Sequence, residues 1–358
     1  MWDAIVAGAG PAGAMAALIL SRAGHRTLLT DRIGSDRFRI GETLPEAAGR
    51  LLRSIGLPAP ETDGPHAAVG GVFLSWNSDE LIALDSFRSP AGHGWRLDRK
   101  RFDADLRTAA IAAGAAYRND RVRHLGRHGA CWEVGLESGD VACARWVIDA
   151  TGRSATLGRR LGARRFRDTG LVAFYARGRP SLALHINRTV IEAVPTGWWY
   201  AARLPSGAPI AGFHTDAREA ARLRANPDAW EQELSRTKHI ARLLSDTQLE
   251  GAHAADARGA RLKDVFGEGW IACGDAAMSF DPISGQGIFS ALHGGLTAGT
   301  AVAAALNGRT ELIDEYSARI NDVWTIYRKR LRSIYQSERR WPAACFWSRW
   351  RDAGFAAN

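Results

Sequence analysis

The chain has 358 residues, of which 46% are hydrophobic and 24% are charged, a balance that is ordinary for a globular protein with a sizeable core and excludes a disordered chain. The formal net charge of +9 comes almost entirely from arginine, since the only lysines are Lys100, Lys238, Lys263 and Lys329. Because the arginines are scattered and not interleaved with stacking aromatic residues, we expect no nucleic-acid partner.

The first readable element is a strand, a tight turn and a helix. An apolar run, Ile5–Ala7, leads into Gly8, Gly10 and Gly13 at GxGxxG spacing, and an apolar helical pattern follows over Ala14–Leu20. The glycines permit the turn, the approach of a pyrophosphate to the backbone, and the close packing of helix on strand. By itself the pattern also suits an ordinary glycine-rich turn.

The second strand supports the dinucleotide interpretation. The apolar segment Thr27–Thr30 ends at Asp31, where a carboxylate could accept hydrogen bonds from a ribose, although a turn residue would also suit this place. Arg39 and Glu42 lie in the following loop, where side chains reach a cofactor. A helix is expected over residues 46–55.

A second sheet is expected to begin over residues 69–87, which alternate in strand fashion around a turn at 77–80. Asp98 then caps a helix that runs to about Ala113. Arg99 lies in the first turn of this helix, where it is placed to meet an anion.

Two further strands end in glycine turns. A small meander over 121–141 feeds a buried strand that ends in Asp149-Ala150-Thr151-Gly152, and Gly269–Cys273 ends in Gly274-Asp275. The loop over 279–287 then precedes a helix over 288–306, where glycines free the backbone to approach a ligand. We expect all three glycine-flanked strand ends to converge on one site.

Between these elements the chain is rich in strands. Turns at 195–197 and 205–209 indicate a meander in one broad antiparallel sheet, and helical patterns follow over 227–244. No Gly/Ser linker separates the parts, which favours interleaved domains. The expected strands are Leu171–Ala176, Leu182–Asn187, Val190–Val194, Trp198–Leu204 and Ile210–Thr215.

Together these motifs resemble the FAD-dependent monooxygenase superfamily of the para-hydroxybenzoate hydroxylase type, which also contains flavin-dependent halogenases and geranylgeranyl reductases. By similarity, Asp31 would hold the adenosine ribose, Arg99 the pyrophosphate side, Asp275 the ribityl or pyrophosphate part, and the 285–287 backbone the isoalloxazine edge. The resemblance implies the following cofactor-binding residues: Gly8, Gly10, Pro11, Ala12, Gly13, Asp31, Arg32, Arg39, Glu42, Thr43, Arg99, Thr151, Gly152, Gly274, Asp275, Pro282, Gly285, Gln286 and Gly287.

The fold implied is α/β, with a three-layer, Rossmann-like FAD-binding domain of the GR2 type, an interleaved antiparallel β-sheet substrate domain and a C-terminal helical tail. The expected FAD domain comprises residues 1–75, 91–165 and 264–335. The substrate domain comprises 76–90 and 166–263, and the tail comprises 336–358.

Three stretches are similar to the flavoproteins that mature cysteine tryptophylquinone by hydroxylating a tryptophan in a peptide or protein. They are Gly41-Glu42-Thr43-Leu44-Pro45, the Trp198-Trp199-Tyr200 strand up to Pro205, and the tryptophan-rich tail after Ser337. Halogenases share a related loop but use a WxWxIP pattern and an early lysine, whereas the first lysine here is Lys100. These departures disfavour halogenation.

The resemblance implies hydroxylation of an electron-rich aromatic ring through a flavin hydroperoxide formed from reduced FAD and O2. No second dinucleotide fingerprint is present, so electrons come from NAD(P)H directly or through a separate flavin reductase. The expected substrate is an aromatic small molecule or a tryptophan-bearing peptide or protein. A flavin-dependent dehydrogenase or reductase of a carbon–carbon bond, and a flavin-binding chaperone without turnover, remain alternatives.

Candidate catalytic residues lie in the sheet. Trp199, Tyr200 and His214 are expected to line the pocket or transfer protons, with core packing as the alternative, because neighbours on a strand face opposite sides. Four cysteines, at 131, 143, 273 and 345, show no metal-ligand spacing, so we expect no metal and buried, reduced thiols. No signal peptide or membrane span is expected, which favours a cytoplasmic location without membrane contact.

Overall fold

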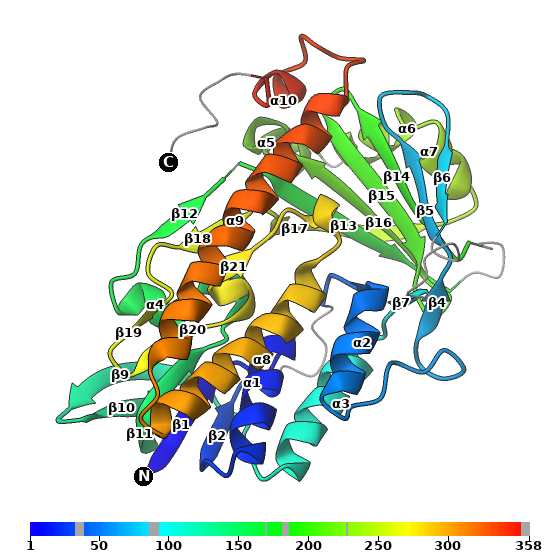
Figure 1. Ribbon diagram of the computed structural model, residues 1–358. Helices are drawn as coiled ribbons and strands as arrows, with labels where there is room; N and C mark the ends of the chain where they lie inside the picture. Colours follow the sequence, from blue (N-terminus) through cyan, green and yellow to red (C-terminus); the bar gives the residue numbers. More distant parts are fainter. Residues whose placement is uncertain (33–38, 86–92, 169, 181–185, 227, 352–358) are drawn as a thin grey trace.

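A computed structural model describes residues 1–32, 39–85, 93–168, 170–180, 186–226 and 228–351. Figure 1 shows a parallel sheet with its helices in the lower part of the molecule and a seven-stranded sheet in the upper part, with α9 (Glu311–Ser337) running along both. The two sheets have separate hydrophobic cores. The α/β class expected from the sequence is confirmed.

The lower sheet is built around β1, whose last four residues are buried because parallel strands are covered on both faces. A meander of two further strands extends β11 on the antiparallel side. In spatial order the sheet contains β19 (Phe266–Gly267), β20 (Trp270–Ala272), β11 (Val141–Asp149), β1 (Trp2–Ala7), β2 (Thr27–Thr30) and β8 (Ala116–Arg118), and the meander strands are β9 (Val122–His128) and β10 (Cys131–Leu136).

Helices α1 (Pro11–Arg22) and α8 (Gly287–Leu306) pack against each other at very close range. A Cβ atom at Gly295 would lie 2.1 Å from the carbonyl oxygen of Ala12, so this contact requires glycine. By length and composition α8 could cross a membrane, but 56% of its apolar window is buried inside the protein, as in a core helix. The other helices of this part are α2 (Glu46–Ser54), α3 (Arg99–Ala112) and α4 (Thr156–Arg160).

The upper sheet is antiparallel except where β14 pairs with β5. Its far face is covered by α5 (Ala217–Ala225), α6 (Ala229–Ser235) and α7 (His239–Leu243), and its near face looks toward the loops of the lower sheet and α9. In spatial order its strands are β17 (Leu249–Asp256), β13 (Val172–Gly178), β16 (Pro209–Thr215), β15 (Gly197–Arg203), β14 (Thr189–Val194), β5 (Gly71–Ser75) and β6 (Ile82–Asp85).

Two three-stranded sheets bridge the parts, and the chain ends with α10 (Cys345–Ser348). One contains β3 (Thr43–Leu44), β7 (Gly94–Arg96) and β4 (Ala67–Val69), and the other contains β12 (Arg165–Arg167), β18 (Ala260–Leu262) and β21 (Met278–Ser279).

Several local expectations can be compared with the structure. Asp98 caps α3 by accepting a hydrogen bond from the Arg101 backbone, as expected. The strand expected over 182–187 lies largely outside the described residues. The hairpin of β5 and β6 belongs as a whole to the upper sheet, whereas the expected domain boundary after residue 75 divides it. Of the four thiols, only Cys273 is fully buried, so the expectation of buried cysteines is wrong for the others.

Candidate functional site

The turn between β1 and α1 depends on glycine at two positions. Gly8 has a φ of +104°, and a Cβ atom there would lie 2.3 Å from the Ala150 carbonyl oxygen. A Cβ atom at Gly13 would lie 1.8 Å from the Gly8 carbonyl oxygen. At Gly10, by contrast, a Cβ atom would meet no atom within 4 Å, so the backbone faces open space beside the N-terminus of the helix. This arrangement can receive a phosphate group.

Asp31 lies directly against this turn. Its Oδ2 accepts a hydrogen bond from the Ala9 backbone at 3.0 Å, which orients the carboxylate at the end of β2. Arg32, which was expected to bind the cofactor, instead pairs with Glu137 at 2.9 Å on the exposed meander. Asp31 is therefore brought to the turn, whereas the expected contact of Arg32 with the cofactor stays a prediction.

At the end of β11, Asp149 organises its own turn. One oxygen accepts hydrogen bonds from the Thr151 backbone and hydroxyl at 3.0 and 2.6 Å, and the other accepts from the backbones of Leu157 and Gly158. The Thr151 hydroxyl is thus engaged within the turn. Gly152 has a φ of +66° and open space beyond it.

The end of β20 lies beside both other strand ends. Gly274 has a φ of +57°, and a Cβ atom there would lie 2.6 Å from the Ala12 Cβ. The Asp275 carboxylate is paired with Arg153, whose Nε lies 3.7 Å away. The backbone carbonyl oxygen of Asp275 accepts a hydrogen bond from Arg165 at 3.1 Å. The prediction that three glycine-flanked strand ends converge is confirmed by these contacts.

Arg153 and Arg165 were not among the residues expected from the sequence. Arg153 also donates to the carbonyl oxygens of Arg258 and Phe280, so it ties the end of β11 to the loop before α8. Arg153 could have been predicted from the sequence because it directly follows Gly152 in the glycine turn. No local sequence pattern identifies Arg165 as a site residue. Burial lowers the pKa of Arg165 to about 10, a value at which it remains charged at neutral pH.

The loop before α8 presents free backbone. Gly285 has a φ of +61°, and Cβ atoms at Gly285 and Gly287 would meet nothing within 4 Å. Gln286 precedes the helix without forming a side-chain cap, so the first N–H groups of α8 keep no side-chain partner there. Pro282 follows the buried Asp281.

These residues fit an extended dinucleotide. Gly10, Gly152, Gly285 and Gly287 leave open space where side chains would otherwise stand, and Asp31 lies at the turn where a ribose would follow. The N-termini of two helices favour negative charge, of a pyrophosphate at α1 and of a reduced isoalloxazine at α8.

The loop over 39–43 is held by ion pairs to the buried carboxylate of Asp103. Arg39 and Arg99 share the carboxylate of Asp103, with Arg39 at 2.6 Å, and Arg99 also donates to the carbonyl oxygens of Ile40 and Gly41. In the structure Arg99 therefore holds this loop through most of its N–H groups. Its expected contact with a pyrophosphate stays a prediction.

Glu42 and Thr43 both contact a third arginine, Arg96. Arg96 pairs with Glu42 at 3.1 Å and donates to the hydroxyls of Thr43 and Thr189, both at 2.7 Å. The Arg96 and Glu42 side chains are only 3% and 5% exposed, so the pair is stable only because each charge has a partner. Arg96 joins the loop to strand β14 of the upper sheet.

The near face of the upper sheet gathers aromatic and neutral polar groups. His214 stacks on Trp198 with ring centroids 3.7 Å apart, and its Nε2 lies 3.1 Å from the Tyr175 hydroxyl. Burial lowers the pKa of His214 to about 3, so the imidazole is neutral at physiological pH. A pKa this low makes the imidazole a weak base, which argues against His214 as a strong proton acceptor.

Tyr200 lies on the same face as Tyr175, with their rings 6.0 Å apart. Its hydroxyl has no hydrogen-bond partner within ordinary distance among the described residues. Burial raises the pKa of Tyr200 well above its usual value, and the negative charge of Glu42 raises it further. Tyr200 and Glu42 therefore face each other across the junction of sheet and loop.

Trp199 lies on the opposite face, which corrects the expectation that it lines the pocket. Its ring is fully buried, stacks on Phe213 at 4.8 Å and meets Trp230 edge-on at 4.6 Å beneath the helices of the far side. Alternation along β15 sends Trp198 and Tyr200 one way and Trp199 the other.

A hydrogen-bonded chain joins the near face to the loop before α8. Trp198 donates from Nε1 to the Tyr335 hydroxyl at 2.8 Å, and Tyr335 donates to Asp281 Oδ2 at 2.8 Å. Tyr327 accepts from the Asp281 backbone at 2.9 Å. Burial raises the pKa of Asp281 to about 7, so this carboxyl titrates near neutral pH.

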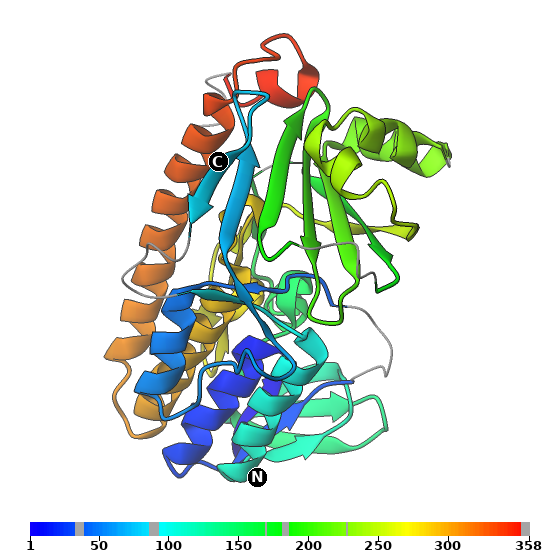
Figure 2. The ribbon, with the colours of Figure 1, turned by 90° about the vertical axis from the view of Figure 1, so that its right-hand side faces the viewer.

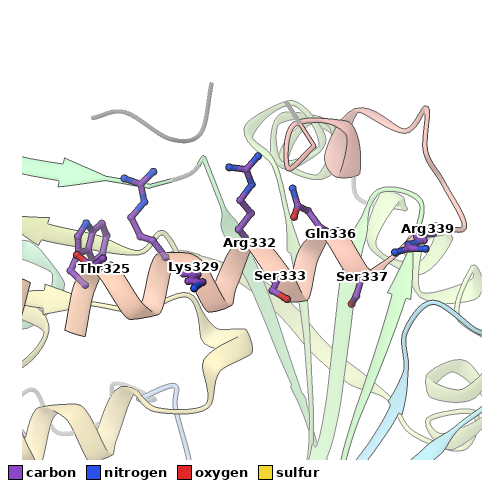
Figure 3. A pocket seen from close by; sticks show the side chains of 9 residues that line it. Thr325, Lys329, Arg332, Ser333, Gln336, Ser337 and Arg339 are labelled. Atoms are coloured by element: carbon purple, nitrogen blue, oxygen red, sulfur yellow. The ribbon is translucent and has the colours of Figure 1, made fainter. Parts of the chain in front are cut away.

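A surface depression with a volume of about 750 Å³ lies along the outer flank of α9, and Figure 3 shows its side chains. It shares no residue with the three strand ends or with the aromatic face, so we do not place the cofactor there. Its lining residues are Trp324, Thr325, Arg328, Lys329, Arg332, Ser333, Gln336, Ser337 and Arg339.

Comparison with known proteins places this geometry in a family. The model of the FAD binding domain family matches residues 1–327. The Marinomonas mediterranea protein LodB, assigned as an FAD-dependent oxidoreductase, is 30% identical and the match covers 97% of this chain and 96% of LodB. The Armillaria mellea flavin-dependent halogenase armH3 is 26% identical over 94% of this chain and 75% of its own length.

Among solved structures, the peptidyl tryptophan dihydroxylase QhpG, essential for tryptophylquinone cofactor biogenesis, is 26% identical with a TM-score of 0.76. That similarity covers 100% of this chain and 80% of QhpG. The chain belongs to the FAD binding domain family and is an FAD-dependent oxidoreductase of the monooxygenase superfamily.

Proposed function

We propose that the protein is a monooxygenase that hydroxylates an electron-rich aromatic ring, a tryptophan or another indole or phenol, carried by a peptide or protein. The observation that supports this most directly is the near face of the upper sheet, where the ring of Tyr200 lies beside Tyr175 and His214, and His214 stacks on Trp198. Aromatic walls with few polar groups suit a flat, neutral ring and exclude water. The likeness to QhpG over the whole chain supports a peptidyl tryptophan.

FAD, when bound and reduced, supplies the activation of O2 from which one oxygen atom enters the ring. The residues of this chain bind and orient the substrate and the cofactor. Glu42, which is paired with Arg96, is the acceptor for an indole N–H or phenol O–H, and Tyr200 is a second polar contact beside it. The N-terminus of α8 would stabilise negative charge on the reduced cofactor.

Electrons come from NAD(P)H bound transiently at the cofactor or from a separate flavin reductase, and the two sources are separable by experiment. Direct oxidation of NAD(P)H by the purified protein would favour the first. Reduction only in the presence of an added flavin reductase would favour the second.

Halogenation is the second candidate, because armH3 is 26% identical to this chain. The placement of lysines argues against it. No lysine precedes Lys100, and that residue is exposed in the first turn of α3. Supplying chloride or bromide with reduced FAD and O2 would reveal halogenation as a halogen isotope pattern in the product.

The central experiment uses the FAD-loaded protein, reduced without oxygen and then mixed with O2 and either free indole or a tryptophan-bearing peptide. We expect a mass gain of one oxygen atom that carries the label when 18O2 is supplied. Product formed without O2 would contradict the monooxygenase proposal and favour a dehydrogenase or reductase.

The cofactor site has its own test in the glycine turn. Gly10→Leu should fold, because a Cβ atom there meets nothing, but its side chain should fill the open space and abolish FAD retention. The absorbance of the purified protein measures retained flavin, and circular dichroism checks the fold. A fully loaded Gly10→Leu protein would show that the pyrophosphate lies elsewhere.

A further inference from the structure

The two outer edges of the upper sheet differ in chemistry. Edge strand β17 carries Glu250 and Asp256, which pair with Arg179 and Arg258. Charges on an edge strand discourage pairing with another chain. The other edge, β6, has no charged residue or proline before Asp85.

Strand β6 is also unusually exposed and apolar. Ile82 and Leu84 are 52% and 53% exposed, and the preceding Leu81 is 38% exposed. Within the described part of the chain, no strand pairs with the outer side of β6. Figure 2 shows the hairpin of β5 and β6 facing the viewer. An apolar edge with free backbone groups is the surface to which an extended peptide adds as a further strand.

The strand register connects this edge to the aromatic face. Ile82 pairs with Leu74, Leu74 with Ile191, Ile191 with Tyr200, and Gly212 then links Tyr200 to Tyr175. Directly paired residues place their side chains on the same face of a sheet. Leu74, Ile191 and Tyr200 also pack against the same core cluster. An apolar row therefore runs across the sheet from the exposed edge to the candidate site.

A second row of paired residues, next to the first, leads to the ion pair of Arg96 and Glu42. Leu84 pairs with Val72, and Val72 pairs with Thr189, whose hydroxyl accepts the hydrogen bond from Arg96. Arg96 in turn holds Glu42. The two exposed apolar residues Ile82 and Leu84 thus lie at the ends of rows that lead to groups of the proposed substrate site.

We propose that β6 is the docking edge for the substrate: an extended segment of the aromatic-bearing peptide pairs with β6 and packs its apolar side chains on Ile82 and Leu84. This inference rests on the proposed function, since it assumes a peptide-borne ring. An added strand lies four strand spacings from β15, or about 19 Å at about 4.8 Å each. At about 3.3 Å per residue, the docking segment is separated from the target tryptophan by roughly six residues.

The test uses FAD-loaded protein and two fluorescent synthetic peptides. Each has a short run of alternating threonine and valine, a glycine–serine spacer and one tryptophan, with a spacer of about one residue or about seven. Binding is measured by fluorescence anisotropy without turnover, and hydroxylation by mass spectrometry under reducing conditions with O2.

The variant is the double substitution Ile82→Lys with Leu84→Lys, and the matched control is Ala252→Lys with Ala254→Lys on the exposed opposite edge strand. We expect both peptides to bind the wild type and the control, with binding weakened about tenfold or more in the β6 variant. Only the long-spacer peptide should be hydroxylated efficiently. Free indole should be turned over equally by all three proteins.

The outcomes separate the two proposals. Binding that depends on β6 but leads to no oxygen insertion, with free indole also unreacted, would support the docking edge and sink the monooxygenase function. Equal binding by the β6 variant, or no binding of either peptide, would overturn the docking edge. Self-association of the wild type that the β6 variant abolishes would overturn it too, because a second copy would then be the occupant.

Discussion

Trp198 and Trp199 are neighbours on one strand and are almost equally buried, at 2% and 0% exposure, yet they lie in different chemical surroundings. Trp199 packs among Phe213 and Trp230, and its indole N–H has no partner within the described residues. Trp198 donates its N–H to Tyr335, which continues to Asp281 beside the open glycine loop. Burial is the same on both faces, so hydrogen bonding is what distinguishes the two indoles.

The largest expected effect concerns the far face. Trp199→Ala should lower the free energy of unfolding by about 3–5 kcal/mol, because it leaves a cavity in a dry aromatic core. Denaturant unfolding measures the loss. The folded fraction should keep its FAD absorbance, and loss of flavin at full stability would contradict the structural role of Trp199.

The next effect concerns Asp281, whose pKa is raised by burial to about 7 from its usual 3.8. Between these two pKa values the folded protein holds a proton on Asp281 that the unfolded chain has released. The free energy of unfolding therefore falls as the pH rises. We expect Asp281 to lower the free energy of unfolding by about 3 kcal/mol between about pH 4 and pH 6.5. Unfolding of the Asp281→Asn variant, measured at several pH values, should lack that slope.

Trp199→Ala is the control for the Asp281 prediction, since the substituted ring lies on the other face of the sheet. Its stability should be lower at every pH but should keep the wild-type slope. An unchanged slope in Asp281→Asn would show that another group titrates there.

The smallest effect compares the two indoles directly. Trp198→Phe removes a buried hydrogen bond and leaves the Tyr335 hydroxyl without its donor, whereas Trp199→Phe removes an N–H that has no partner. With equal changes in ring size, Trp198→Phe should be the more destabilising by about 1 kcal/mol. Chemical denaturation measures both losses. Equal losses in the free energy of unfolding would contradict the proposed difference between the two faces.

The cofactor cradle was largely predictable because it depends on local backbone geometry. Gly8 and Gly13 follow from spacing alone, since any Cβ atom there would collide with backbone. Asp31 follows from its position after the second strand. Arg32 and Arg99 were less predictable because a flexible guanidinium binds whichever carboxylate or carbonyl oxygen the fold brings near, here Glu137 and Asp103.

The sequence by itself determined that three strand ends with glycine turns must meet, because parallel strands bring their carboxyl ends to one edge of a sheet. It also determined that Trp198 and Trp199 point apart. Only the tertiary structure decided which of them faces the loop before α8, because that depends on which face α9 and the helices after β16 cover. The link from Trp198 to Tyr335 spans 137 residues, and no local pattern encodes such a contact.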